Sequence, residues 1–468
     1  MKKYWHICFI LCALILFQIL VTPVAAINED DISVTQGCRG INADVPYLGT
    51  DQKISNAEAV ILYESGTDTL MYAWNADKPM YPASLVKIMT ALIAVEQADI
   101  SDIVTVKASS LSQIPADATS AELLADEVMT LEQLLYCLLV ESANDAAAVI
   151  ADHIGGSQSA FVAMMNQRAV ELGCTGTNFT NPHGLHNENQ ITTARDMAKI
   201  LTAAMKNELF RKYFGTTHYT VEATNKSEPR DLASGNHMMH KSTYEIYYDA
   251  RVAGGRTGVT NSGSNCLATA AKSGNMELIC IVMGSKTSFI AGTGYIDRIG
   301  GFEETTRLLD LGFNGLRAAQ ILYENQAVQQ HTVVNGDSDL VVGPQVSISA
   351  VVPDNADLSS LNFRYSAPVT DLQAPIALGQ HILDLEIWDG NVCIAYAPLY
   401  AMNAVNEAQL NILDTQEDTS GGSWGTILII LLILAILVVF CWFVLRIIST
   451  RRYITAGKQF QPKKRRVR

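Results

Sequence analysis

Between residues 57 and 317 the chain has strand-like runs near both ends and helical spacing between them. Two β-type runs, residues 59–63 and 69–72, flank five turn-forming residues and predict a hairpin. Two further runs, residues 266–271 and 276–283, flank a second turn-like stretch. Strands at both ends of a largely helical middle predict an α/β layer in which the N-terminal and C-terminal strands share one sheet.

Helical spacing is clearest in two segments of that middle. From residue 84 to 97, apolar side chains recur at intervals of three and four residues, which predicts a helix. Thr130 and Gln133 have the spacing of a capping box. A second helix is therefore expected to begin there and to run through Val140.

After Arg317 the pattern changes to short alternating runs between turn residues. Residues 345–351 and 381–387 alternate apolar and polar positions, and no long helical pattern accompanies them. This pattern predicts a small all-β domain over residues 318–412. Residues 414–423 are polar and contain glycine, which is typical of a linker, so a linker is expected over residues 413–423.

Two long apolar segments lie at the ends of the chain. The first follows Lys2 and Lys3 and stops before small residues at Ala26, which is typical of an export signal cleaved after that residue. Residues 424–445 are 22 positions without a charge, enough at about 1.5 Å per residue to cross a hydrocarbon core of about 30 Å. Nine cations and no acid follow, so the tail is expected in the cytoplasm and the body outside the cell.

Charge distinguishes the ends of the chain from its body. The formal net charge is −14, from 33 Lys+Arg and 47 Asp+Glu, and this acidic balance argues against a nucleic-acid binder. All 47 acids and only 22 of the cations lie between the two ends, so the exported part carries a net −25. Its cysteines lack the spacing of a disulfide scaffold, and Cys137 and Cys280 lie in apolar runs that predict buried thiols.

Ser84 and Lys87 form a Ser-x-x-Lys motif in the first predicted helix. At a spacing of three residues, the hydroxyl and the amine share one face of a helix. A serine hydroxyl needs a base to take its proton, and a lysine whose surroundings lower its pKa can be that base. The motif alone fits equally well a helix-capping serine followed by a surface lysine.

Two further triplets offer the rest of a serine-enzyme site. Ser142 and Asn144 follow the apolar stretch at the end of the second predicted helix, where their side chains could face a cleft. Arg256, Thr257 and Gly258 precede the next strand-like segment. A cation at the start of a strand, followed by small residues, suits capture of the carboxylate of an extended peptide.

In this order the three motifs resemble the signature of the penicillin-recognising serine enzymes, most closely the D-alanyl-D-alanine carboxypeptidases among the low-molecular-mass penicillin-binding proteins. The flanking residues 81–90, 178–185 and 193–198 are also similar to that family. The resemblance implies a β-lactamase-like α/β transpeptidase-type domain, followed by the all-β domain and one C-terminal transmembrane helix. The expected division begins with a signal peptide (1–26), an N-terminal lead (27–55) and the serine D,D-carboxypeptidase domain (56–317). It continues with the all-β domain (318–412), a linker (413–423), the transmembrane helix (424–446) and a basic cytoplasmic tail (447–468).

The resemblance also implies a mechanism that needs no cofactor or metal. Ser84 would attack the carbonyl between two terminal D-alanines of a peptidoglycan stem peptide, with Lys87 as base, and form an acyl-enzyme that water hydrolyses. Ser142 would relay the proton to the departing amine, and the backbone N–H groups of Ser84 and Val259 would form the oxyanion hole. β-Lactams would be covalent inhibitors. Substrate binding would fall to Asn144, Arg256, Thr257, Gly258 and Val259.

Arg256 departs from the family, which usually has lysine at this position. Arginine still binds a carboxylate, and does so bidentately, but it cannot give up its proton and its fork is larger. Any part of this cation in proton transfer, and the usual affinity for β-lactams, therefore stay open. Also open are a D,D-endopeptidase acting on cross-links and a low-turnover β-lactam sensor or wall-binding protein. A β-lactamase fits less well, because the trailing domain and the tether suit a wall enzyme.

Four residues outside the motifs are weaker candidates. His183 and His186 have a spacing found in metal ligands, but no acid lies near them as it does in a zinc-protease helix. The family resemblance instead favours a role for His183 in ordering the loop beside the cleft. Arg195 and Asp196 are expected to be structural charges at the start of a helix.

Overall fold

The computed structural model describes residues 39–51, 54–241, 245–289, 296–365 and 372–408, together with 431–434, 436 and 442. The expected signal peptide, linker and basic tail lie outside the described residues, as does nearly all of the expected transmembrane helix. Within the part of the chain that is described, no helix combines the length and the apolar content needed to cross a bilayer.

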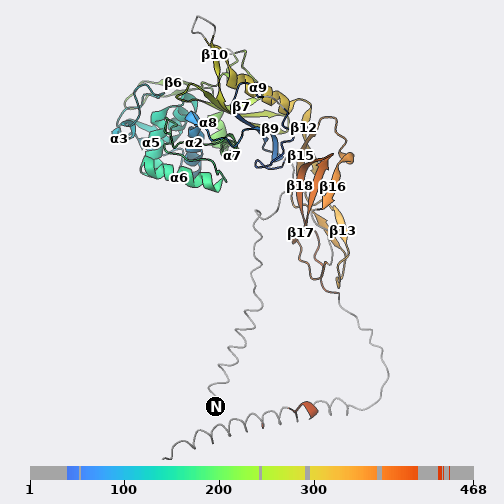
Figure 1. Cartoon of the computed structure of the whole chain (residues 1–468). Helices are drawn as coiled ribbons and strands as arrows, with labels where there is room; N and C mark the ends of the chain where they lie inside the picture. Colours follow the sequence, from blue (N-terminus) through green and yellow to red (C-terminus); the bar gives the residue numbers. More distant parts are fainter. Residues whose placement is uncertain are drawn as a thin grey trace, which may run out of the picture. The chain divides into compact units, whose positions relative to one another are not determined.

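An antiparallel sheet with the strand order β2-β1-β9-β8-β7 forms the centre of the first domain (Figure 1). Its strands are β1 Ala59–Glu64, β2 Thr69–Trp74, β7 Val252–Val259, β8 Asn265–Ser273 and β9 Met276–Ser285. The predicted hairpin is β1 and β2, and the two later predicted strands are β8 and β9. Because β1 pairs with β9, strands from both ends of the domain share one sheet, as predicted.

The Arg256 triplet lies inside β7, a strand that the sequence analysis did not predict. The strand reads Val-Ala-Gly-Gly-Arg-Thr-Gly-Val, and glycine and alanine weaken the usual strand signal. β7 pairs with β8 on one side and is the last strand of the sheet in the described part of the chain. The cation therefore lies in the middle of an edge strand, and not at a strand's start as the pattern suggested.

Helices and short strands surround this sheet. Thr130 and Gln133 exchange the two hydrogen bonds of a capping box at the start of α4, as predicted. The helices are η2 Ala83–Leu85, α2 Val86–Gln97, α3 Ala108–Leu111, α4 Leu131–Tyr136, η3 Cys137–Glu141, α5 Asn144–Gly155, α6 Gln158–Glu171, α7 Ala194–Ala204, α8 Glu208–Phe214, η4 His237–Met239 and α9 Gly300–Phe313. The short strands are β3 Ile103–Thr105, β4 Val128–Thr130, β5 His218–Val221, β6 Arg230–Ala233, β10 Thr287–Phe289 and β11 Ile296–Ile299.

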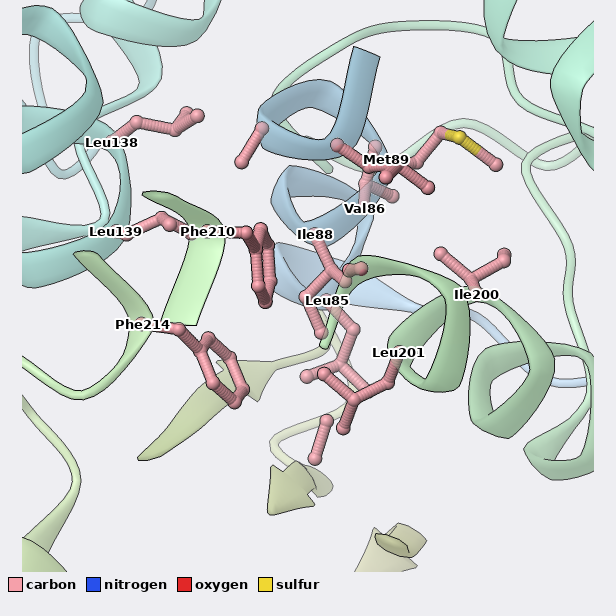
Figure 2. Close-up of a cluster of buried hydrophobic side chains, with 14 of the residues drawn as sticks. Leu85, Val86, Ile88, Met89, Leu138, Leu139, Ile200, Leu201, Phe210 and Phe214 are labelled. Carbon is pink, nitrogen blue, oxygen red and sulfur yellow. The ribbon is translucent and has the colours of Figure 1, made fainter. Parts of the chain in front are cut away.

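Both faces of the sheet are buried, which explains why its central strands are continuously apolar. Successive side chains of a strand point to opposite faces. Ile61 and Ile281 thus belong to the core shared with the helical layer, whereas Leu62 and Cys280 belong to the core shared with α9. Figure 2 shows the helical layer, in which residues of α2 and its first turn contact α7, α8 and η3: Leu85, Val86, Ile88, Met89, Leu138, Leu139, Ile200, Leu201, Phe210 and Phe214.

The second domain is built from strands, in agreement with the predicted all-β domain. Its main sheet has the order β13-β14-β18-β17-β16, and β12 pairs with β15. The strands are β12 Leu316–Leu322, β13 Gln329–His331, β14 Leu340–Gly343, β15 Ile348–Pro353, β16 Asn362–Tyr365, β17 His381–Asp389 and β18 Val392–Ala401, with one short helix, η5 Leu358–Ser360. A separate apolar core fills this domain.

Candidate active site

Ser84 and Lys87 lie together at the start of α2, as their spacing predicted. Ser84 is in the η2 turn that leads into α2, and Lys87 is one turn further on. The Lys87 Nζ atom lies 3.1 Å from the Ser84 Oγ atom. Ala83, just before the serine, has φ of +48°, a backbone conformation that non-glycine residues rarely adopt. Such local strain is often found where a fold holds a reactive side chain in place.

Lys87 is completely buried, and three oxygen atoms surround its amine. Besides the Ser84 hydroxyl, the Nζ atom contacts Asn144 Oδ1 at 2.8 Å and the His183 carbonyl oxygen at 2.5 Å. Burial, and next the charge of Arg256, hold the pKa of Lys87 well below its usual value, while the charge of Asp145 acts in the opposite direction. A neutral amine has a lone pair, so Lys87 can accept the proton of the Ser84 hydroxyl.

Ser142 and Asn144 follow an irregular end of the second predicted helix. After α4 the chain forms a π-helical turn, η3, a feature that is frequent at functional sites. Ser142 ends this turn in the left-handed conformation, with φ of 69°. Asn144 begins α5, and its Nδ2 atom donates to the Thr119 carbonyl at 2.9 Å while its Oδ1 atom faces Lys87. The second triplet therefore meets the first through Asn144.

Arg256 extends from β7 to the same irregular turn. Its side chain is buried; Nη1 donates to the Leu139 carbonyl at 2.7 Å and Nε donates to the Thr257 carbonyl at 3.2 Å. Burial lowers the pKa of Arg256 to about 10, so the guanidinium stays charged at neutral pH. A guanidinium has five N–H groups. Beyond these two backbone contacts, Arg256 keeps donors for an anionic ligand.

Two glycines bring the chain against the Ser84 turn. A Cβ atom on Gly258 would lie 2.9 Å from the Ser84 nitrogen, and one on Gly184 would lie 2.1 Å from the Ala83 carbonyl oxygen. Gly184 also has φ of +92°, which favours glycine. A larger residue at either position would displace the backbone of the Ser84 turn. The close approach of β7 leaves the backbone nitrogens of Ser84 and Val259 on neighbouring segments.

The three triplets border one cavity of about 420 Å³, which we call the catalytic cavity. Its lining includes seven of the eight predicted site residues: Ser84, Ser142, Asn144, Arg256, Thr257, Gly258 and Val259. Lys87, the eighth, lies behind Ser84 and reaches it from the core. The structure therefore brings together residues that are up to 175 positions apart in the sequence.

Several residues of the site were not predicted, because they act through backbone atoms or distant loops. The carbonyls of Leu139 and His183 accept hydrogen bonds from the buried side chains of Arg256 and Lys87, and a backbone carbonyl leaves no signal in the sequence. Asp145 is buried and accepts from Ser120 Oγ at 2.6 Å, from the Ala121 nitrogen at 3.1 Å and from the Leu123 nitrogen at 3.0 Å. These bonds fix the loop whose residues Asp117, Ala118 and Thr119 line the catalytic cavity.

Three of the four weaker candidates, His183, Arg195 and Asp196, have structural surroundings, whereas His186 lines the catalytic cavity. Burial and the nearby Lys87 lower the pKa of His183 to about 3, and its Nδ1 atom accepts from the Leu185 nitrogen at 3.2 Å within the loop beside the cavity. Arg195 pairs with Asp77, and Asp196 accepts from the Gly176 nitrogen and the Thr177 hydroxyl. Across the residues with described positions, no group of three or more His, Cys, Asp or Glu side chains is arranged to hold a metal ion.

Comparison with known proteins finds a matching family for each of the two domains. Residues 48–287 match the family described as D-alanyl-D-alanine carboxypeptidase, and residues 318–407 match the C-terminal domain of penicillin-binding protein 5. The chain is 30% identical over 377 residues to the D-alanyl-D-alanine carboxypeptidase DacA of Haemophilus influenzae, covering 79% of this chain and 90% of that protein. It is 28% identical to DacF of Bacillus subtilis, covering 77% and 88%. The crystal structure of penicillin-binding protein 5 from Haemophilus influenzae has a TM-score of 0.66 and 29% identity, covering 77% of this chain and 100% of that one.

Proposed function

The chain belongs to the D-alanyl-D-alanine carboxypeptidase family, and from this membership we propose that it removes the terminal D-alanine from peptidoglycan stem peptides. The observation that carries the proposal is the contact of the buried Lys87 amine with the Ser84 hydroxyl, at the edge of a cavity that the Arg256 guanidinium lines. This arrangement supports Ser84 as nucleophile, Lys87 as general base and Arg256 as the group that holds the carboxylate of the substrate.

Acylation begins when the substrate lies along the edge of β7 with its carboxylate at Arg256 and Thr257. The Ser84 hydroxyl gives its proton to the neutral Lys87 amine, and Oγ bonds to the carbonyl carbon between the two D-alanines. The negative charge on the carbonyl oxygen is stabilised by the backbone N–H groups of Ser84 and Val259. The C–N bond then breaks, and the departing amine receives the proton from Lys87 through the Ser142 hydroxyl.

Deacylation repeats the same chemistry with water. Lys87, neutral again, takes a proton from a water molecule, and the resulting hydroxide attacks the ester carbon on Ser84. The ester C–O bond breaks, and the proton on Lys87 returns to the Ser84 oxygen. The shortened peptide leaves with a terminal carboxylate. β-Lactams would enter at the acylation step and remain on Ser84 as covalent inhibitors.

A direct test measures D-alanine released from a peptide that ends in D-Ala-D-Ala. The wild-type chain should release D-alanine, and Ser84→Ala should release none. Ser109→Ala is a matched control, because Ser109 lies in α3 outside the catalytic cavity. Equal release by wild type and Ser84→Ala would refute the role of Ser84, and no release by wild type would refute the activity.

We also propose that the enzyme is exported and held at the membrane by its C-terminal apolar segment. The support comes from the sequence: a signal-like start and an uncharged stretch of 22 residues before nine cations. The catalytic domain would face the cell wall, and the basic end would meet anionic lipid head groups. Deleting residues 424–468 should release the active enzyme from the membrane fraction, and retention of the truncated chain there would refute the anchor.

A further inference from the structure

A second pocket adjoins the catalytic cavity on the opposite side of β7. This side pocket has a volume of about 180 Å³. It shares three lining residues with the catalytic cavity, Gly235, Thr257 and Val259, and continues between β8 and the start of α9. None of the catalytic groups Ser84, Lys87 and Ser142 lines it. The side pocket is therefore a neighbour of the catalytic cavity but separate from the reacting atoms.

The register of β7 explains this separation. Arg256 pairs with Ala268, which belongs to the core of the helical layer, and Thr257 pairs with Leu267, which belongs to the core against α9. Because successive side chains alternate between the faces of a strand, Arg256 lies on the face of Ser84 and Thr257 on the face of α9. A ligand held at both residues straddles the edge of the strand, and its substituents can reach either face.

Apolar side chains form much of the wall of the side pocket, which also includes His237, Thr257 and Asn265. Leu267, Ile299 and Phe302 line it, and Leu267 and Phe302 are almost completely buried. An apolar cavity of about 150 Å³ in another protein admits a benzene molecule. At about 180 Å³ the side pocket has room for a branched or aromatic side chain, whereas the methyl group of D-alanine would leave most of it empty.

The proposed binding mode places the leaving residue next to this opening. In that mode the carboxylate of the last substrate residue lies at Arg256 and Thr257, so its α-carbon lies near the three shared lining residues. We propose that the side pocket binds an apolar side chain on the C-terminal D-residue of the substrate, so that the enzyme releases residues of the size of D-leucine as well as D-alanine. This inference rests on the proposed function and defines its substrate class.

The reaction with such a substrate is the same hydrolysis. The amide C–N bond before the last residue breaks, Ser84 takes the acyl group, the larger D-amino acid leaves as an amine, and water then cleaves the ester. Only the leaving group changes, so no additional catalytic group is needed. The selectivity then depends on how much apolar side chain leaves water in the side pocket.

The test compares two acylated peptides that differ only in the last residue, D-Ala-D-Ala and D-Ala-D-Leu, with the full chain. Wild type should cleave the D-Leu peptide with a kcat/KM at least equal to that for the D-Ala peptide. Ile299→Trp fills the side pocket. It should lower the kcat/KM for the D-Leu peptide, relative to that for the D-Ala peptide, by about tenfold or more, because a hydrophobic pocket discriminates by this factor per methylene. Its kcat/KM for the D-Ala peptide should fall much less than that for the D-Leu peptide, because the methyl group of D-alanine fills little of the side pocket.

Two further variants make the result decisive. Ile103→Trp is the matched control, because Ile103 is 65% exposed on β3 and lines neither cavity. Ile299→Ala enlarges the side pocket and should raise the relative kcat/KM for a D-Ala-D-Phe peptide. Two results would overturn only the proposed role of the side pocket. One is cleavage of the D-Ala peptide without cleavage of the D-Leu peptide, and the other is a ratio of the two kcat/KM values that neither Ile299 variant changes. Absence of cleavage of every peptide by wild type would overturn the proposed function and this inference with it.

Discussion

The two domains differ in where they bury charge. In the first domain, buried ionisable side chains include Lys87, Asp145 and Arg256 within or beside the catalytic cavity, and Glu64, Glu127, Asp196 and Glu304 elsewhere. In the described part of the β domain, Glu386 is the one charged side chain classed with the buried residues. Both domains nevertheless contain an extended apolar core.

This difference distinguishes buried charged groups that take part in the reaction from those that affect only the stability of the fold. Burying a charge destabilises a fold unless hydrogen bonds or an opposite charge offset the loss of water. The first domain accepts this cost at the cavity, where each of the three groups has backbone or side-chain partners. The β domain has no comparable cluster among its described residues. Substitution of the buried groups at the cavity should therefore affect activity, whereas substitution of Glu386 in the β domain should affect only stability.

The largest effect is expected from removal of the proposed general base, Lys87. Lys87→Ala should lower kcat/KM by about 10²–10⁴-fold, since general base catalysis contributes that much. Lys212→Ala is the control, because Lys212 forms an exposed pair with Glu132 away from the cavity. Steady-state kinetics of D-alanine release check this. A loss of only a few fold would show that another group takes the proton.

Replacement of Arg256 should have the next largest effect. Arg256→Ala removes a charge-assisted contact with the substrate carboxylate and should lower kcat/KM by about 10–100-fold, mainly through KM. Arg256→Lys keeps the charge and should retain most of the activity. Kinetics of both variants with the same peptide test this. Equal collapse of the two would indicate that Arg256 acts instead through its bond to the Leu139 carbonyl.

Loss of the Asp145 carboxylate should loosen the loop over the cavity. Asp145→Asn places an NH₂ group against donors that now bond to a carboxylate, which should cost about 1–3 kcal/mol of unfolding free energy. Asp152→Asn, on the same helix, is the matched control. Denaturant unfolding followed with both variants measures the difference. Equal stability of the two variants would refute the role of Asp145 in holding this loop.

The pH profile should report the charge near Lys87. The reaction needs the neutral amine, so kcat/KM should rise with pH through the pKa of Lys87, which lies well below that of an ordinary lysine. Arg256→Gln removes a charge that lowers this pKa, so the midpoint should move to higher pH. Asp145 has the opposite influence, and His183, with a pKa of about 3, carries no charge near neutral pH. A midpoint that stays fixed or moves to lower pH would contradict this.

The smallest effect is expected in the β domain. The guanidinium of Arg364 lies 4.3 Å from the centre of the Trp388 ring. Arg364→Ala should reduce the unfolding free energy by about 0.5–1 kcal/mol and leave D-alanine release unchanged. Thermal unfolding and kinetics of the same preparation check both parts. Any loss of D-alanine release in solution would contradict the expectation that substitutions in the β domain affect only stability.

Local patterns predicted much of the fold and the composition of the site. The hairpin, the capping box of Thr130 and Gln133 and the all-β texture after Arg317 depend on neighbouring residues, and all three are present. The three motifs predicted the residues of the site because the chemistry of each side chain can be read directly from the sequence. The motifs did not predict which backbone and side-chain contacts hold these groups in place.

The features that sequence did not predict depend on contacts between distant segments. β7 is a strand although glycine weakens strand propensity: Gly258 fits closely against the Ser84 turn, and Gly254 and Gly255 fit against Phe214 and Asn236. The π-helical turn η3 places Leu139 where its carbonyl meets Arg256, 117 residues away. Asp145 holds a loop that begins 25 residues earlier. Such pairings arise only when the chain is folded.

The central claim is that Ser84 carries the acyl group during turnover. Acid quenching of the enzyme with a D-Ala-D-Ala peptide, followed by proteolysis and mass spectrometry, tests it directly, because acid preserves the ester. We predict one added acyl group on the fragment that contains residue 84 in wild type, and none in Ser84→Ala. An acyl group on another fragment, or turnover by Ser84→Ala at the wild-type rate, would contradict the account.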